Sequence, residues 1–487
     1  MTFLETAAAP EKLRRIAIDP VTRVEGHGKV TLLLDKDNRV QQARLHIVEF
    51  RGFEAFIEGR PYWEAPVVVQ RLCGICPVSH HLAAAKAMDI IAGYAALTPT
   101  AEKLRRLLHY GQLIQSHALH FFHLSSPDLL LGFESEVAQR NIVGIAAAFP
   151  ELARMGVLTR KFGQEVIRHI VGKRIHGTGC IPGGMNKGLK QQERDALRAD
   201  IDQIVVWSRE AVGLVRRLHE TDPQFYASFG ESRANMMGLV DAEGALDFYH
   251  GGLRARDADG GPIFDHADYA TYATLLREEV KPWSYMKFPH IRTLGAEAGW
   301  YRVGPLARVQ IADRLKSEQA EAERQIFLAA GGGQVLHGAL FFHWARMIEM
   351  LHAAELARDL LDDPEILGAE LMADKGPRQE EGIGVIEEPR GTLFHHYKVN
   401  EDDVITYCNL IVSTTNNNQA MNEAIRSVAA KFFDGRAVTE GLLNHVEIAI
   451  RAYDPCLSCA THALGQMPLQ IEVLDAEGAR VSQGTKG

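Results

Sequence analysis

Short runs of apolar and β-branched residues dominate the first fifty positions of the chain. They fall at residues 15–19, 28–34 and 42–50, and Asp35-Lys36-Asp37-Asn38 supplies a turn between the last two. A polar, irregular loop over residues 19–27 separates the first two runs. The pattern predicts a small β layer at the N-terminus, over about residues 15–50.

From about residue 65 the apolar positions recur every three or four residues, the spacing of one face of an α-helix. Helices are predicted at residues 78–95, 100–124, 191–220, 310–328, 338–361, 418–433 and 439–452. Loops rich in glycine, proline and polar residues are predicted at residues 176–188, 255–265 and 376–391. We therefore expect a fold that is mainly α with small β elements, an α+β architecture.

No repeat of fixed period and no obvious linker divides the chain. One large domain is expected over residues 1–462, with the β layer at about 15–50 and a helical body over about 65–462. Residues 463–487 form a C-terminal extension. There, residues 469–474 predict a strand, and a turn follows at 475–478.

The composition is that of a soluble globular protein, with 46% hydrophobic and 24% charged residues in 487. The net charge of -9 argues against nucleic acid or an anionic membrane as the main partner. No apolar run approaches the roughly 20 residues that span a bilayer, and residues 1–10 lack the pattern of a secretory signal. A cytoplasmic location is expected, although a partner carrying a signal could export such a chain.

Four of the six cysteines form two Cys-x-x-Cys pairs, Cys73 with Cys76 and Cys456 with Cys459. This spacing lets two sulfurs face one point, so two pairs can hold a soft metal with four thiolates. Zinc ribbons space their pairs by roughly 15–20 residues, against about 380 here, and neither pair has the βαβ context of thioredoxin-like thiols. From spacing alone, zinc, another metal and redox thiols all stay open. Cys180 and Cys408 fit buried apolar positions.

With their flanks, the two pairs resemble the signature motifs of nickel–iron hydrogenase large subunits. The first is Arg-x-Cys-Gly-x-Cys-x-x-x-His over residues 71–80, and the second is Asp-Pro-Cys-x-x-Cys-x-x-His over 454–462. Blocks at residues 21–27, 51–54 and 389–391 also resemble this family, in the family's order, although many relatives have alanine where this chain has Glu388. The runs at 76–81 and 451–456 resemble most the NAD-reducing, bidirectional branch.

The resemblance implies a Ni–Fe centre whose iron carries CO and cyanide ligands. By motif position, Cys73 and Cys456 would bind nickel terminally, and Cys76 and Cys459 would bridge nickel and iron. Soft thiolate ligands suit such a centre. The expected fold is that of a nickel–iron hydrogenase large subunit.

The resemblance also assigns four charged residues around the metals. Glu25 would carry protons, where the bland alternative is a solvated loop glutamate. Arg390 would lie above the metals and stabilise developing charge, where the alternative is a surface arginine. Asp454 and Asp128 would hold Arg390 through charge-assisted hydrogen bonds, although Asp454 before a proline is also an ordinary turn former.

Further contacts are implied by position. His80 would donate a hydrogen bond to a bridging sulfur, and Ser413 would bind a cyanide ligand, although its neighbours Val412 and Thr415 depart from the family's proline and tryptophan. Glu54 and His462 match ligands of a buried magnesium ion, whose place another ion could take. The histidines on one helical stretch are expected to be core residues rather than a metal ladder: His109, His117, His120 and His123.

The implied reaction is reversible heterolytic oxidation of dihydrogen, with electrons leaving through a partner. The chain has too few cysteines for an additional iron–sulfur cluster and no nucleotide-binding fingerprint. The expected partners are an Fe–S small subunit, flavin and Fe–S diaphorase subunits that reduce NAD, nickel-insertion proteins, and an endopeptidase that removes residues 463–487 after His462. The alternatives are a deazaflavin- or ferredoxin-linked hydrogenase of the same family, or a hydrogen-sensing regulator.

Overall fold

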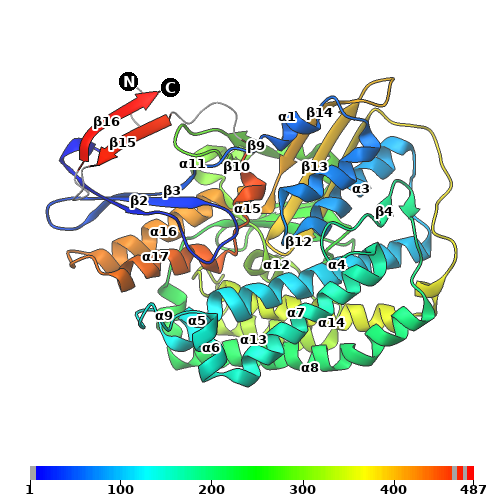
Figure 1. Ribbon diagram of the computed structural model, residues 1–487, viewed down its shortest axis with the longest axis horizontal. Coiled ribbons are helices and arrows are strands. Elements are labelled where there is room, and N and C mark those ends of the chain that lie inside the picture. Colours follow the sequence, from blue (N-terminus) through cyan, green and yellow to red (C-terminus); the bar gives the residue numbers. More distant parts are fainter. Residues whose placement is uncertain (1–6, 463–468, 475–479, 487) are drawn as a thin grey trace.

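The computed structural model describes residues 7–462, 469–474 and 480–486 (Figure 1). An N-terminal antiparallel sheet contains β1 (Arg14–Ile18), β2 (Gly28–Leu34) and β3 (Val40–Ile47), in that order. Leu32 pairs with Ile16 on one side and with Ala43 on the other. The predicted β layer is therefore confirmed. Its middle strand, β2, is buried, and β3 packs against a helix of the body at residues 418–433.

Long helices form the body of the molecule below this sheet in Figure 1. They are α4 (Pro99–Leu119), α7 (Pro150–Val171), α8 (Gln191–Thr221) and α14 (Phe341–Asp362). Thr98 caps α4, because its side chain accepts a hydrogen bond from the Ala101 amide at 3.3 Å, and Pro99 opens the first turn. Helices α4 and α7 approach closely at two glycines: a Cβ on Gly163 would lie 2.5 Å from the Gly111 carbonyl oxygen.

A second antiparallel sheet packs on the helix that follows the first cysteine pair. It contains β12 (Glu381–Glu388), β13 (Gly391–Val399) and β14 (Ile405–Ile411), and it lies against α3 (Pro77–Ala92). The packing is close, because a Cβ on Gly384 would lie 2.1 Å from the Ala83 carbonyl oxygen. The loop predicted over residues 376–391 is wrong for residues 381–388, and only two residues, Pro389 and Arg390, turn between β12 and β13.

A third sheet has the strand order β11 (Tyr301–Arg302), β6 (Asn235–Val240), β7 (Gly252–Arg256) and β8 (Pro262–Ala267). The loop predicted at residues 255–265 is correct only for the turn between β7 and β8. In that turn the Asp257 side chain accepts hydrogen bonds from the amides of Asp259 and Gly261, so the polar residues fix a hairpin.

The predicted helices over residues 418–433 and 439–452 are α16 (Asn418–Phe433) and α17 (Glu440–Ala452). The single helix predicted over 310–328 is wrong. It is two helices, α12 (Pro305–Ile311) and α13 (Glu318–Ala330), whose junction is held by Arg324 through the carbonyl oxygen of Val309 at 2.7 Å. The apolar period continues across the junction and hides the break.

The remaining helical elements are short: η1 (Pro10–Lys12), α1 (Phe53–Ile57), η2 (Tyr62–Glu64), α2 (Ala65–Val68), η3 (Val69–Leu72), η4 (His120–Ser125), α5 (Ser126–Leu131), α6 (Ile142–Ala148), α9 (Pro223–Ser228), η5 (Tyr269–Thr271), α10 (Tyr272–Leu275), η6 (Arg292–Leu294), α11 (Gly295–Ala298), η7 (Pro364–Leu367), α15 (Ser413–Asn416) and η8 (Ser458–Ala460). The remaining strands are β4 (Cys180–Ile181), β5 (Gly184–Met185), β9 (Leu276–Glu279), β10 (Phe288–Ile291), β15 (Leu469–Leu474) and β16 (Arg480–Lys486).

The pairing of β15 with β16 confirms the strand predicted in the C-terminal extension, whereas the turn predicted at 475–478 lies outside the described residues. None of the described helices is long and apolar enough to cross a membrane. The fold is mainly helical with small sheets, as predicted, and one hydrophobic core cluster extends from Ile18 to Ala460.

Candidate metal centre

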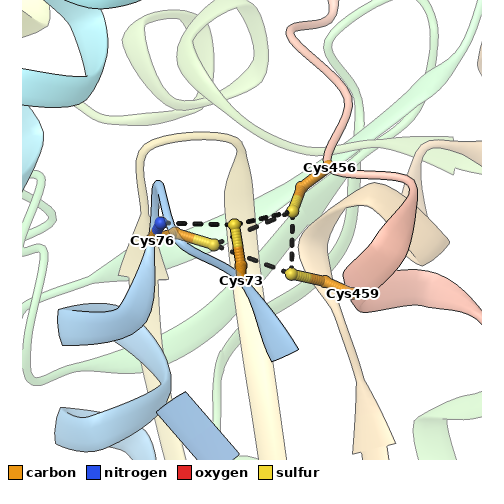
Figure 2. Close-up of side chains that lie close together, drawn as sticks. All are labelled: Cys73, Cys76, Cys456 and Cys459. Carbon is orange, nitrogen blue, oxygen red and sulfur yellow. Dashed lines mark hydrogen bonds between the residues drawn. The ribbon is translucent and has the colours of Figure 1, made fainter. Parts of the chain in front are cut away.

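The two cysteine pairs come from segments at opposite ends of the described body and meet in its interior. Cys73 follows η3, and Cys76 occupies the N-cap of α3. Cys456 lies in the loop after α17, and Cys459 lies in η8. Figure 2 shows the four sulfurs converging, with the first pair on a blue segment and the second on a red one.

The sulfur positions fit ligands of a shared metal site. The Sγ atom of Cys456 lies 3.2 Å from that of Cys73, 3.9 Å from that of Cys76 and 2.7 Å from that of Cys459. All four lie within 4.8 Å of one another, and all four cysteines are buried. Two thiolates on one ion lie within about 4.6 Å of each other, twice a metal–sulfur bond of about 2.3 Å. Among the described residues, no other such cluster of metal-ligating side chains occurs.

The site favours thiolate at Cys73. Hydrogen bonds from Cys456, Cys459 and Cys76 hold the pKa of the Cys73 thiol well below its usual value. The amides of Ile75 and Cys76 also donate to its sulfur, at 3.1 and 3.4 Å. Burial raises the pKa of Cys459 well above its usual value, so further thiolates here need a cation beside them.

Glu25 lies against the second cysteine pair. The Sγ atom of Cys456 and the amide of Ser458 donate to its Oε2 atom, at 3.0 and 3.1 Å, and its carbonyl oxygen accepts from Leu457 at 2.9 Å. Burial, followed by the negative charge of Cys73, raises the pKa of the Glu25 carboxyl. A solvated loop glutamate would show neither contact, so the bland alternative is wrong.

Arg390 is buried in the two-residue turn between β12 and β13. Its Nε atom donates to the Asp454 carbonyl oxygen at 2.5 Å, and its Nη2 atom lies 3.3 Å from the Asp454 carboxylate. Its Nη1 atom has no hydrogen-bond partner among the described residues. The Arg390 guanidinium is thus fixed by Asp454 and keeps one donor free, so it is not a surface arginine.

The predicted contact between Asp128 and Arg390 is wrong. Asp128 instead accepts hydrogen bonds from Arg23 at 2.6 Å and from Arg451 at 3.0 Å. Asn444 donates to the same carboxylate at 3.2 Å. Asp128 therefore ties the loop that carries Glu25 to α17, because its buried carboxylate makes charge-assisted hydrogen bonds to Arg23 in the loop and Arg451 in the helix.

Glu388 is a site residue whose role the sequence did not reveal. Its carboxylate accepts a hydrogen bond from the Ser413 hydroxyl and lies 3.8 Å from the Nη1 atom of Arg390. Burial raises the pKa of Glu388 to about 8. In the sequence, Glu388 was noticed only as a departure from the alanine expected by resemblance. Such a departure does not tell which residues the side chain contacts. Ser413 is thus bonded to Glu388 in this structure.

His80 is buried on α3, and its Nδ1 atom lies 3.1 Å from the Nε2 atom of His395. No hydrogen bond from His80 to a cysteine sulfur occurs in the described contacts, so its predicted role stays a prediction. His395 lies on β13 and its Nδ1 atom contacts the Tyr397 hydroxyl at 2.7 Å.

The pair predicted to hold magnesium lies in a buried, charged environment. Glu54 accepts from the Leu410 amide at 2.9 Å and from Lys287 at 3.2 Å, and Lys287 also pairs with Glu278 at 3.4 Å. Burial lowers the pKa of His462 to about 3, and neither of its ring nitrogens has a partner among the described residues. A neutral imidazole with unpaired nitrogens can act as a metal ligand. Lys287, however, already places one positive charge beside Glu54, where the ion would bind.

Three of the histidines of α4 and η4, His109, His117 and His120, are buried core residues as expected, whereas His123 is only half-buried. His109 contacts the Glu387 carbonyl oxygen at 2.9 Å, and His120 contacts that of Arg451 at 2.6 Å. His117 faces Glu349 at 3.3 Å. Cys180 and Cys408 are buried outside the cluster.

Comparison with known proteins gives the same reading over most of the chain. The profile described as Nickel-dependent hydrogenase matches residues 51–134 and 247–462, and one described as HoxL-like matches residues 15–50. The NAD-reducing hydrogenase HoxS subunit beta of Cupriavidus necator is 46% identical, over 96% of this chain and 99% of its own length.

An archaeal relative, from the vhc F420-non-reducing hydrogenase of Methanococcus voltae, is 39% identical over 96% of this chain and 99% of its own. A crystal structure of an NAD+-reducing NiFe-hydrogenase in the H2-reduced state is 58% identical, with a TM-score of 0.91 over 94% of this chain and all of that one. Four convergent thiols, a matching profile and these relatives agree: the chain belongs to the nickel-dependent hydrogenase family.

Proposed function

We propose that this chain is the catalytic large subunit of an NAD-reducing hydrogenase. The reaction is the reversible oxidation of dihydrogen to protons and electrons. The observation that carries the proposal is the convergence of four buried thiols in a chain 46% identical to a NAD-reducing hydrogenase subunit. A Ni–Fe centre with CO and cyanide on its iron, held by the thiolates of Cys73, Cys76, Cys456 and Cys459, would supply the redox chemistry.

Glu25 is the proposed proton acceptor in the forward direction. Its Oε2 atom already lies 3.0 Å from the sulfur of Cys456, a hydrogen-bond distance that permits proton transfer. Its raised pKa brings the carboxyl nearer to working pH, so it can both take and release a proton. Asp19 and His27, at the two ends of the loop that carries Glu25, are exposed to solvent.

Arg390, held by Asp454, is proposed to place a fixed positive charge over the centre. A guanidinium keeps its charge when buried, so it stabilises negative charge without exchanging a proton. Asp128 supports the loop of Glu25 instead. His80 is proposed to donate a hydrogen bond to a cluster thiolate when the centre is bound. Ser413 is proposed to donate to a cyanide ligand, for which its single hydrogen must turn away from Glu388.

The electrons are proposed to pass first to an Fe–S small subunit, then to NAD through flavin and Fe–S diaphorase subunits. The relative with 46% identity is itself named as one subunit of a NAD-reducing hydrogenase. The proposal includes a cytoplasmic location and one catalytic unit over residues 1–462. It also includes nickel-insertion proteins and an endopeptidase that removes residues 463–487 after His462.

Magnesium at Glu54 and His462 is proposed as a second, structural ion. A hard dication favours the Glu54 carboxylate and retains water molecules. Metal analysis tests this directly. One magnesium ion per chain, lost in the Glu54→Gln variant, would support this site. An active sample without magnesium would refute it, because Lys287 alone would then balance the charge of Glu54.

The deciding experiment is metal analysis and infrared spectroscopy of the chain purified with its partner subunits, with dihydrogen-dependent NAD reduction as the assay. Equal nickel and iron, bands of CO and cyanide, and NADH formation are expected. Zinc alone, in a chain that mass spectrometry shows to end at His462, would refute the proposal. Turnover with a deazaflavin or ferredoxin but not NAD would favour the alternative acceptors, and binding of dihydrogen without turnover would favour a sensor.

A further inference from the structure

The backbone just before Arg390 is held by a second arginine from a different part of the chain. Arg308, on α12, donates from Nη1 to the Glu388 carbonyl oxygen at 2.7 Å and from Nη2 to the Pro389 carbonyl oxygen at 3.4 Å. Helix α12 also begins directly against this turn, because a Cβ on Gly304 would lie 2.5 Å from the Arg390 carbonyl oxygen. The turn that carries Arg390 is therefore fixed from the side of α12.

Two buried carboxylates take the remaining donors of Arg308. Its Nε and Nη2 atoms donate to the two carboxylate oxygens of Glu349, on α14, at 2.7 and 2.6 Å, and its Nη1 atom donates to Glu387 at 2.9 Å. All three side chains are inaccessible to solvent. A guanidinium has five N–H groups, and in Arg308 one bond at Nε, two at Nη1 and two at Nη2 use all of them. Arg308 thus has one fixed orientation relative to the turn.

The guanidinium of Arg390 depends on the position of this turn. Both of its hydrogen bonds go to Asp454, through the carbonyl oxygen at 2.5 Å and the carboxylate at 3.3 Å. Asp454 belongs to a distant segment of the chain, just before Cys456. The two bonds can form only where the turn brings the Arg390 backbone to the correct distance from that segment.

We propose that Arg308 is a positioning residue which, by holding the Glu388 and Pro389 carbonyl groups, keeps the Arg390 guanidinium against Asp454. A misplacement of about 1 Å in a reacting geometry can change a rate by roughly 100-fold, so a fixed charge needs support of this kind. The use of Arg390 at the metals rests on the proposed Ni–Fe centre, whereas the placement of its side chain does not.

Another buried arginine offers a matched control. Arg105, on α4, is also inaccessible to solvent and donates to both carboxylate oxygens of Asp89, at 2.6 and 3.1 Å. It also donates to the carbonyl oxygens of Ile181 and Gly184, at 2.9 and 3.0 Å. Replacement of either arginine by lysine keeps the charge but leaves three donors on one nitrogen, which cannot span a carboxylate and two carbonyl groups. Only the change at Arg308 touches the turn of Arg390.

The first test is NMR of the full, metal-free chain labelled with nitrogen-15 arginine, with Arg390→Lys to assign the Arg390 Nε–H signal. Slow exchange of this hydrogen with solvent is expected in the unchanged chain and in Arg105→Lys. In Arg308→Lys the exchange rate is expected to rise by roughly tenfold or more, the effect of losing one charge-assisted hydrogen bond. An unchanged rate in Arg308→Lys, or an equal rise in Arg105→Lys, would overturn the proposal.

Glu349→Gln carries the test if Arg308→Lys does not fold. The amide keeps the size of the side chain but replaces one acceptor oxygen by a donor, so Arg308 loses its two-point contact with α14. The exchange rate of the Arg390 Nε–H is then expected to rise in the same direction, by a smaller factor. A rate equal to that of the unchanged chain would refute the proposal.

The second test uses the metal-loaded complex. Arg308→Lys is expected to shift the CO and cyanide infrared bands at unchanged nickel content, and Arg105→Lys is expected to leave them in place. Unshifted bands beside faster exchange would refute the link to the centre. Absence of the bands in the unchanged complex would instead refute the proposed function, while the NMR result would still decide the role of Arg308.

Discussion

At the scale of single residues, Glu388 shows how burial changes the chemistry of one side chain. Its carboxyl is buried between the Ser413 hydroxyl and the Arg390 guanidinium. Burial raises its pKa from 4.5 to about 8. The folded chain therefore holds this proton over a pH range in which the unfolded chain has lost it, and the contribution to stability declines as pH rises from 4.5 to 8.

Glu388→Gln should remove that pH dependence. The melting temperature of the metal-free variant, relative to the unchanged chain, is expected to rise between pH 5 and pH 8. The corresponding difference in unfolding free energy is at most about 1.4 kcal/mol per pH unit. Differential scanning calorimetry at several pH values measures it, with Glu210→Gln on the exposed face of α8 as the control. A constant difference across that range would contradict a raised pKa.

Glu25→Gln tests the proton acceptor. The amide keeps the size of the side chain but cannot take a proton from the centre. Dihydrogen-dependent dye reduction is expected to fall by roughly 10²- to 10⁴-fold while nickel content is unchanged. Glu49→Gln, which removes a carboxylate paired with His27 at the surface, should leave the rate near normal. Parallel loss of nickel in Glu25→Gln would indicate that Glu25 supports the ligands instead.

At the scale of secondary structure, most of the long helices were predictable from the sequence, whereas strand β12 was not. Helices α16 and α17 follow their apolar period almost residue for residue. In β12, by contrast, Gly382 and Gly384 suggested a loop, although they are glycines because α3 packs directly on the strand. The two glycines, with Pro377 and Pro389 nearby, outweighed the apolar signal of Ile383, Val385 and Ile386, which are buried in the same strand.

The contact between α3 and β12 predicts an effect of Gly384→Ala. The new methyl group would lie 2.1 Å from the Ala83 carbonyl oxygen, so the helix or the strand must move. A loss of roughly 1–3 kcal/mol in unfolding free energy is expected, with reduced nickel content because β12 leads into the Arg390 turn. Gly213→Ala in α8, whose new methyl group would meet only Arg217 at 3.3 Å, should be neutral or stabilising by up to about 1 kcal/mol. Equal melting temperatures for both variants would contradict the packing argument.

The sequence predicted the cysteines of the candidate site, but not the residues that hold the neighbouring side chains in place. The cysteines and Glu25 belong to short motifs whose spacing carries the chemistry. Lys287 beside Glu54, and Asp128 beside Arg451, are brought together only by the tertiary fold. Contacts between residues hundreds of positions apart leave no local pattern, so sequence reasoning placed Asp128 on the wrong arginine.

At the scale of the whole molecule, the loop over residues 19–27 near the N-terminus is hydrogen-bonded to the C-terminal part of the chain. The Thr22 amide donates to Glu447 at 2.6 Å, Arg451 donates to the Thr22 carbonyl oxygen at 3.0 Å, and the Glu25 backbone pairs with Cys456. A metal on the four thiolates joins the same two regions. Metal loading should therefore stabilise the whole body rather than one loop.

Cys456→Ala and Cys180→Ala separate that effect from ordinary loss of a buried thiol. Both cysteines are buried, but only Cys456 belongs to the cluster. The melting temperature is expected to rise on metal loading in the unchanged chain and in Cys180→Ala, and to stay level in Cys456→Ala. A rise of equal size in all three, measured by calorimetry, would show that the metal binds elsewhere.

The wide separation of the two cysteine pairs has a consequence in time. Cys76 and Cys456 are 380 residues apart, so synthesis at about 5–20 residues per second leaves the first pair without its partner for roughly 20–80 s. During that interval two thiols beside a nascent helix are open to any soft cation in the cell. The correct metal is therefore best delivered after translation is complete. A chain released from a ribosome that stalls before residue 456 would keep the first cysteine pair without its partner, open to other soft cations.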